Sequence, residues 1–465
     1  MDGFRLLSPA QIALLLGSMA GLLAGATTVA LAGGSVVSTG TSEPGVMIEA
    51  THLPPLLTRA GEAVELAYEA FCPGGVDAGG IEAPCEVTGT VFARPASKGS
   101  FASIPLETAA SAAGRELVAT VPGEIAAAPG GFEYYATLTA DGTSITLPAG
   151  GASAPHESVR LERPTIVDLG RHVFGEARRP SARVAEASWG TGPAEVGLET
   201  GHNLSPIGAS AFDVGLDGSV YLLDEARHRV LRWDESARAP RQVPLSVSGS
   251  LADMTVAPDG SIYVLETVAG PGGSPVLIRF DRDGRELERG ETADRTASQI
   301  RMGARGPVVL QQPSHEWMPV TVRGTMAGAE EQRRSGRVAR PLAAGGDVTV
   351  LRRGDEIRIA ITTGGGTRLS WRVVSDTPVG EVQLAEPLGG GRLAVVFRAF
   401  TDDEAEFIVL VLDAHGVRER FSVNAVDWAE SAPLGRFTVV GSSLFRLGSS
   451  PHGAFVDRFD LEVSS

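Results

Sequence analysis

The chain has 465 residues, of which 43% are hydrophobic and 21% charged, a balance typical of a folded protein and not of a disordered one. At this length two folded units plus a short leader are expected. The formal net charge is −16, which repels a phosphate backbone and argues against nucleic acid as a partner. The 58 glycines and 29 prolines separate short apolar runs, and this pattern predicts an all-β protein.

An uncharged, mostly apolar segment covers residues 12–32 and is preceded by Arg5. It is long enough to cross a hydrocarbon layer of about 30 Å as a helix. It also ends in Ala30-Leu31-Ala32, a small-x-small pattern of the kind that signal peptidase cuts. Residues 1–42 are therefore interpreted as a transmembrane anchor or a signal peptide plus a linker. The rest of the chain is expected to be exported, and to be membrane-anchored or, after cleavage behind Ala32, secreted.

Three glycines in this segment, Gly17, Gly21 and Gly25, are spaced four residues apart. On a helix this spacing places them on one face, where two backbones can approach closely, so they form a candidate dimer face of the anchor. The alternative is that small residues are simply common in a leader of this composition. If the leader is cleaved, the mature protein has no such dimer face.

Residues 43–163 contain seven or eight short β-patterned runs with turn signals every 8 to 15 residues. Asp141-Gly142 joins two of these runs and predicts a tight hairpin. We expect a β-sandwich here. In strand number and order it resembles bacterial immunoglobulin-like modules.

The two cysteines of the chain, Cys72 and Cys85, flank a Gly-rich and Pro-rich loop in this region. In an exported chain such a pair predicts a disulfide, worth about 3 kcal/mol in the loop-entropy model. A metal site would need more ligands than two thiols, and a redox pair is usually CxxC.

A repeat begins beyond residue 164. Residues 212–224 align with residues 254–266 at an offset of 42, and each copy reads as strand, Asp-Gly turn and strand. Weaker copies follow with spacings of 42 to 49 residues, which are typical of the four-stranded blades of a β-propeller. We therefore predict six blades over residues 164–465, with a strand near residues 166–173 completing the last blade.

The first repeat combines Asp217-Gly218 and Val220-Tyr221 with the run Arg227-His228-Arg229-Val230. This unit resembles an NHL repeat, although the third to sixth units keep only the period. The resemblance implies a six-bladed propeller that binds proteins or small ligands at one face of its central channel. It does not imply catalysis.

The chain contains no G-x-S-x-G, H-E-x-x-H, P-loop or G-x-G-x-x-G motif. The candidates for a site at the channel mouth are His228, in the NHL-like strand, and the adjacent pair His315-Glu316. Neighbouring residues on a strand point to opposite faces, which weakens the case for the pair. No cofactor is expected. The one alternative is calcium at an acidic cluster of Asp402, Asp403, Glu404 and Glu406, which also fits a solvated loop.

Two classes of function remain. The favoured one is a non-catalytic exported protein of the cell envelope that binds an envelope protein, glycan or small ligand through a propeller face. The alternative is a propeller enzyme, either similar to the streptogramin-inactivating lyases or a lactonase-like hydrolase, with a His/Glu pair or a metal at the channel mouth.

Overall fold

The computed structural model describes residues 48–461 apart from the following gaps: 53–56, 59–62, 73–85, 97, 110–115, 129, 149, 161–162, 202–204, 268–274, 293–296, 312–315, 321–338, 354, 367 and 431–434. The described chain is almost entirely β-structure, as its composition predicts, with one short helix, α2 (Gly123–Ala126). The N-terminal segment and Gly17, Gly21 and Gly25 lie outside the described residues. None of the helices in the described part is both long and apolar enough to span a bilayer.

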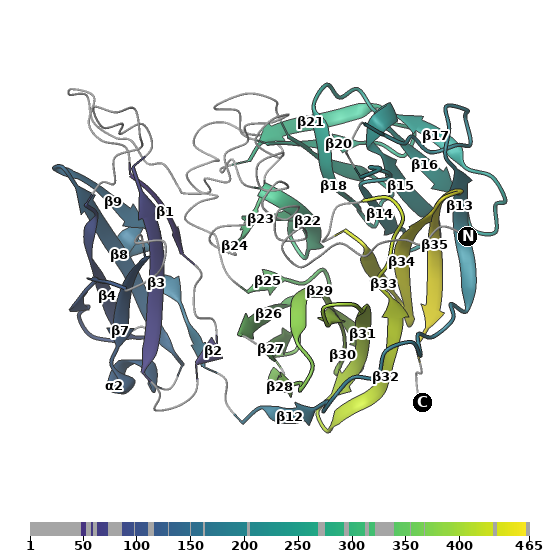
Figure 1. Ribbon diagram of the computed structural model, residues 1–465. Coiled ribbons are helices and arrows are strands. Elements are labelled where there is room, and N and C mark those ends of the chain that lie inside the picture. Colours follow the sequence, from purple (N-terminus) through teal and green to yellow (C-terminus); the bar gives the residue numbers. More distant parts are fainter. Residues whose placement is uncertain are drawn as a thin grey trace, which may run out of the picture.

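The N-terminal part of the structure is a sandwich of two antiparallel sheets (Figure 1). One sheet has the order β1 (Glu49–His52), β3 (Val64–Phe71), β7 (Glu116–Val121) and β6 (Glu107–Thr108). The other has the order β10 (His156–Glu157), β8 (Phe132–Ala140), β4 (Thr88–Pro95) and β5 (Ala102–Pro105), with β9 (Thr143–Leu147) also paired to β8. Two short strands, β2 (Leu57–Thr58) and β11 (Val159–Arg160), pair in parallel beside the sandwich.

Alternation of side chains explains why these strands form two layers. Along β7, Leu117, Ala119 and Val121 are buried and the residues between them are not. These side chains share one core with residues of the opposite sheet such as Val91 and Leu138. Each sheet therefore hides one face against the other, as in any β-sandwich.

Among the described residues between 165 and 460, six further sheets are formed. Three of them have four strands in chain order. They consist of β14 (Ala211–Val214), β15 (Val220–Asp224), β16 (Arg229–Trp233) and β17 (Arg241–Pro244); β18 (Ser250–Val256), β19 (Ile262–Thr267), β20 (Val276–Phe280) and β21 (Glu286–Glu291); and β29 (Val379–Gly389), β30 (Arg392–Phe400), β31 (Ala405–Asp413) and β32 (Gly416–Asn424).

The other three sheets are formed differently. One contains β22 (Ala297–Gly303), β23 (Gly306–Gln311) and β24 (Glu316–Pro319). The second has the order β12 (Thr165–Asp168), β28 (Arg368–Val374), β27 (Glu356–Thr363), β26 (Gly346–Arg353) and β25 (Arg340–Pro341). The third has the order β13 (Ala182–Ser188), β35 (Gly453–Asp460), β34 (Ser443–Ser450) and β33 (Phe437–Val440).

These sheets follow one another around a ring. Strand β14 contacts β18 and β33, β18 contacts β22, β24 contacts β25, and β29 contacts both β26 and β33. Apolar cores fill the spaces between neighbours; for example, Tyr221 of β15 shares a core with Met254 and Ile262 of the next sheet. Because every sheet is covered on both faces only by its neighbours, the arrangement is a β-propeller (Figure 1).

The repeat seen in the sequence corresponds to real structural units. Gly218 and Gly260 occupy equivalent turns between the first two strands of successive sheets, with φ of 77° and 80°. These left-handed conformations are the reason why the Asp-Gly pair recurs, since glycine adopts them without a steric penalty.

The ring is closed by a strand from the beginning of the propeller, but not by the predicted one. Strand β13 pairs antiparallel with β35 and completes the last sheet. Residues 165–168, near the predicted position, instead form β12, which pairs in parallel with β28 of another sheet. Burial explains the choice, because Ala185 and Ala187 of β13 fit the core between the last sheet and the first, whereas Ile166 of β12 is exposed.

Candidate functional site

The most distinctive surface feature is the seam where the last sheet meets the first. The connection that leads into β33 and the connection that leads into β14 run side by side there. Ile207 and Glu430 form a parallel bridge, in which Gly208 N donates to Glu430 O at 2.9 Å and Glu430 N donates to Pro206 O at 2.7 Å. Backbone hydrogen bonds thus join the connection before β14 to the connection before β33.

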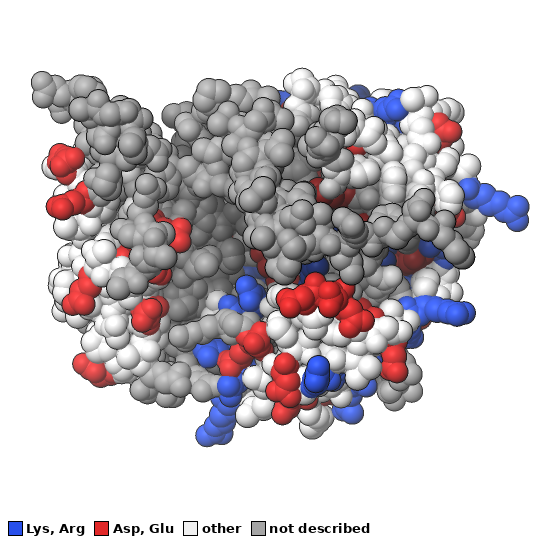
Figure 2. Space-filling model, in the orientation of Figure 1, with Lys and Arg blue, Asp and Glu red and all other residues white. Residues whose placement is uncertain are grey.

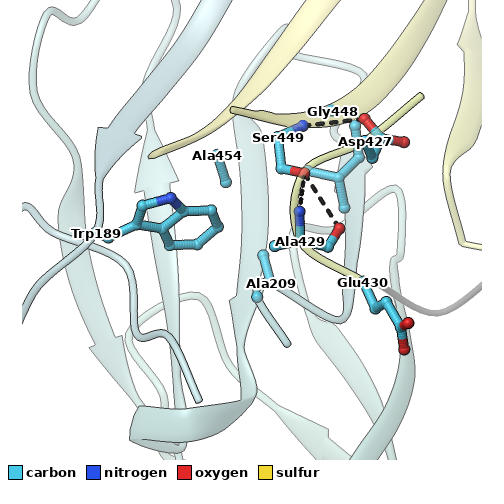
Figure 3. Close-up of a pocket in the computed structure, with 10 residues that line it drawn as sticks. Trp189, Ala209, Asp427, Ala429, Glu430, Gly448, Ser449 and Ala454 are labelled. Atoms are coloured by element: carbon cyan, nitrogen blue, oxygen red, sulfur yellow. Dashed lines mark hydrogen bonds between the residues drawn. The ribbon is translucent and has the colours of Figure 1, made fainter. Parts of the chain in front are cut away.

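A shallow pocket opens at this seam (Figure 3). The indole of Trp189 forms one wall and donates from Nε1 to Ser450 O at 2.9 Å. Gly208 is required beside it, because a Cβ there would lie 2.7 Å from the Trp189 ring. The remaining wall is made largely of small residues, namely Ala209, Ala429, Gly448, Ser449 and Ala454.

The size of this pocket limits what it can bind. Sites that enclose a drug-sized molecule usually measure about 300–1,000 Å³. The enclosed space here is about 10 Å³, comparable to the space that one water molecule needs. The pocket is therefore a shallow depression of the surface and encloses no ligand.

Asp427 holds the polar side of the pocket in place (Figure 3). Its carboxylate accepts hydrogen bonds from Ser449 N at 3.1 Å, Arg446 Nη2 at 2.9 Å and Arg436 Nη1 at 3.3 Å. The hydroxyl of Ser449 in turn accepts from Ala429 N and donates to Ala429 O. The loop that carries Asp427 is therefore fixed on both sides by hydrogen bonds.

An exposed apolar surface borders the pocket. Val426 and Trp428, on either side of Asp427, are 72% and 39% exposed, and Ile207 is 40% exposed. The ring centroids of Trp428 and Trp189 are 5.9 Å apart. We call Ile207, Val426 and Trp428 the seam patch. Exposed aromatic and aliphatic side chains on a rigid loop are typical of protein contact sites.

Two buried carboxylates on the first strands of neighbouring sheets have structural partners. Asp213 of β14 accepts from Val256 N at 2.8 Å and from the hydroxyls of Thr255 and Thr438. Asp253 of β18 accepts from Ile300 N and from the guanidinium of Arg301, both at 2.9 Å. Burial raises the pKa of both carboxyl groups. Each carboxylate thus ties its strand to the first strand of a neighbouring sheet.

The structure describes two of the three predicted channel candidates, and these two lie in different sheets. His228 lies in the exposed turn between β15 and β16, with φ of 48°, and its ring makes no hydrogen bond within the described part of the chain. Glu316 begins β24, at the edge of its three-stranded sheet. His315 lies outside the described residues. A role for these residues at a channel mouth stays a prediction.

Glu316 contacts the sandwich. His156 Nδ1 lies 2.9 Å from Glu316 Oε1, although without the alignment of a hydrogen bond, and both side chains are buried. Beside them, His52 Nδ1 donates to Ala67 O at 2.7 Å and its Nε2 accepts from the Tyr134 hydroxyl at 2.9 Å. We call this group, which also includes Tyr68 stacked on His52, the junction cluster.

The acidic loop considered for calcium does not converge on a metal position. Asp402, Asp403 and Glu404 are exposed, whereas Glu406 accepts from His172 Nε2 at 2.8 Å and from Gly175 N at 2.9 Å. Across the residues that the structure describes, no three His, Cys, Asp or Glu side chains are grouped closely enough to hold a metal ion. Cys72 directly follows β3 and is buried. Because Cys85 lies outside the described residues, the disulfide stays a prediction.

No family model and no curated protein matches the chain. Solved structures that are similar include the virginiamycin B lyase of Staphylococcus aureus, with 10% identity over 54% of this chain and 95% of that chain and a TM-score of 0.31. YCF48 from Cyanidioschyzon merolae has 10% identity over 61% and 99% of the two chains and a TM-score of 0.33. Hydrazine synthase of Kuenenia stuttgartiensis has 13% identity over 57% and 90%, with a TM-score of 0.33. Similarities this distant carry no argument about function.

The residues of the seam could not have been selected from the sequence. Trp189 and Ser449 are separated by 260 positions and belong to no shared motif. A weak signal was present in Val426-Asp427-Trp428, where apolar residues stand in the connection between β32 and β33. Ring closure is what brings these residues together.

Proposed function

We propose that this chain is an exported protein of the cell envelope that binds another envelope protein through the seam patch and does not catalyse a reaction. The observation that carries the proposal is an exposed aromatic and aliphatic surface on a hydrogen-bonded loop, at the seam where the last sheet meets the first. A rigid surface of this kind loses little conformational entropy on binding. Export is supported by the apolar segment 12–32 and by the predicted cysteine pair.

The His/Glu pairs of the structure support a non-catalytic function. His156 with Glu316 and His172 with Glu406 are both largely buried, and neither pair lines the seam pocket. A general acid or base must reach the atom it protonates or deprotonates. The face seen in Figure 2 carries both acidic and basic side chains.

We further propose that the propeller has six blades of the NHL-like type and that the sandwich is immunoglobulin-like. The number of blades is supported by the six sheets that follow one another around the ring. The sandwich order β1-β3-β7-β6 against β5-β4-β8-β9 corresponds to the A-B-E-D and C′-C-F-G orders of immunoglobulin-like sandwiches. The six sheets also agree with the NHL resemblance of the first unit.

The proposal is tested by affinity capture with the full chain. A C-terminally tagged chain would be crosslinked in cells and recovered from envelope extracts, as wild type and as Trp428→Ala. We expect a specific envelope protein to be recovered with the wild type and its yield to fall about tenfold or more with Trp428→Ala, since aromatic anchors often contribute 2 kcal/mol or more.

The matched control is Leu216→Ala, which removes another exposed apolar side chain, 75% exposed, from the β14–β15 turn. Recovery with this variant should equal that of the wild type. Equal recovery with Trp428→Ala, or turnover of a substrate that depends on His228, would contradict the proposal.

A further inference from the structure

Three exposed side chains form a row across the seam. Ile207 bridges Glu199 in the antiparallel sense and Glu430 in the parallel sense. Ile207 N donates to Glu199 O and Glu199 N donates to Ile207 O, both at 2.9 Å. Residues that face each other in such bridges direct their side chains to the same side, with Cβ atoms about 5 Å apart. A carboxylate therefore stands on each side of the exposed Ile207 side chain.

Trp428 shares this surface with Glu430. Both residues are exposed and the intervening Ala429 is buried, which is the alternation of an extended segment. The Glu430 side chain points away from Asp427, on the outer side of the loop (Figure 3). The indole and the carboxylate are therefore two positions apart on one exposed face, which also carries Ile207 of the seam patch.

The two carboxylates of the row are not engaged by cations of this chain. Among the described residues, neither Glu199 nor Glu430 forms an ion pair. Burial lowers the pKa of Arg436, and Asp427 and Glu430 oppose this shift, but the guanidinium group of Arg436 donates to Asp427. A cation from another molecule could thus bind at Glu430 without displacing an existing partner.

The propeller itself shows how an aromatic ring and a nearby carboxylate hold a cation. Two of its arginines each lie over an aromatic ring and pair with a carboxylate two positions from that ring. They are Arg183 over Phe455 at 3.8 Å with Asp457, and Arg178 over Phe421 at 4.5 Å with Glu419. These separations are those of a cation–π contact. Trp428 and Glu430 have the same spacing, and no arginine of the described residues stacks on Trp428.

We propose that the seam patch binds an arginine side chain of the protein partner, with the guanidinium group over Trp428 and paired with Glu430. Glu199 supplies a second negative charge across Ile207. This inference rests on the proposed function and specifies the chemistry of the partner. Arginine is favoured over lysine because a planar guanidinium group can stack on the indole while it donates to a carboxylate, whereas an ammonium group is compact and strongly hydrated.

The site is tested with N-acetyl-arginine amide as the probe and the full chain in detergent. The indole Nε1–H resonance of Trp428 is assigned from its loss in Trp428→Phe, and that of the fully buried Trp371 serves as the internal control. The probe is titrated at constant ionic strength. We expect a saturable shift for Trp428 and none for Trp371. N-acetyl-citrulline amide, which is neutral and similar in shape, should give no saturable shift.

Linear, unsaturable shifts with the arginine probe would overturn the inference. So would binding of N-acetyl-lysine amide as tight as that of the arginine probe, since stacking of a planar group on the indole would then contribute nothing.

The carboxylates are tested by charge removal. Glu430→Gln should weaken binding of the probe about threefold, and the double variant Glu199→Gln/Glu430→Gln should weaken it further, as expected for exposed charge pairs. Melting temperatures should stay within about 2 °C of the wild type, because both side chains are exposed. Glu107→Gln, which removes an exposed carboxylate from β6 of the sandwich, is the matched control. Equal affinity of the wild type and the double variant would contradict the proposal.

Capture experiments separate this inference from the proposed function. If a partner is recovered, its yield should fall about tenfold with Glu199→Gln/Glu430→Gln and stay unchanged with Glu107→Gln. Replacing arginines of the partner by glutamine then identifies the one that binds. Undiminished recovery with the double variant, together with a loss in Trp428→Ala, would refute the arginine site and leave the proposed function standing. Saturable binding of the arginine probe without any partner would do the reverse.

Discussion

At the scale of single residues, His52 shows how strongly burial controls charge in this protein. Its ring is enclosed by Tyr68, Tyr134 and His156, donates to a backbone carbonyl and accepts from a hydroxyl. Burial, and next the neighbouring His156, lowers the pKa of His52 to about 3. The residue is therefore neutral in the folded protein at any pH at which the protein would be studied.

This depressed pKa predicts acid sensitivity of the sandwich. Between about pH 6.5 and pH 3 the unfolded chain binds a proton at His52 that the folded chain does not, so stability is lost as the pH falls through this range. In His52→Gln, unfolding free energies from urea titrations at pH 4 to 6.5 should depend less steeply on pH than in the wild type. Equal slopes for the two proteins would contradict this assignment.

At the scale of elements, the closing strand β13 contributes to the stability of both the last sheet and the first. It supplies one edge of the last sheet and, through Ala185 and Ala187, part of the core shared with the first sheet. The register of β13 against β35 is therefore constrained, because a shift by one residue would turn its alanines away from the core.

Ala187→Asp should open the ring. The substitution places a carboxylate in an apolar core where Ala187 is 3% exposed, and we expect a loss of about 3 kcal/mol or more. Thermal unfolding and native-state proteolysis would detect the loss and show whether cleavage begins near residues 189–210. Glu186→Gln, on the exposed face of the same strand, is the control and should change stability by less than about 1 kcal/mol.

At the scale of the whole molecule, the junction cluster links the sandwich to the propeller. His156 of β10 and Glu316 of β24 meet as a buried pair, although they lie 160 positions apart. Removal of one partner from a buried polar pair leaves the other polar group buried alone, which costs free energy.

Glu316→Gln and His156→Gln should therefore each destabilise the protein by about 1–3 kcal/mol, and the double variant by less than the sum. Chemical denaturation of the four proteins gives the coupling energy. Glu157→Gln, on the exposed neighbour of His156, controls for surface effects. Additive effects of the two single variants would show that the pair does not couple the two units.

The sequence alone determined the features that depend on local rules. Alternating apolar residues, glycine turns such as Gly218 and Gly260, and a spacing near 42 residues predicted an all-β chain with a propeller, because side-chain period and turn conformation are local properties. The same rules could not choose between β12 and β13 as the closing strand, since both are short apolar runs and only packing against the neighbouring sheets separates them.

Tertiary structure decided everything that depends on contacts between distant parts of the chain. It placed Glu316 against His156, and it brought Trp189 beside Trp428 by closing the ring. No local pattern encodes such pairs, because each partner is a common residue in an ordinary strand or loop. These residues become neighbours only when the propeller ring closes.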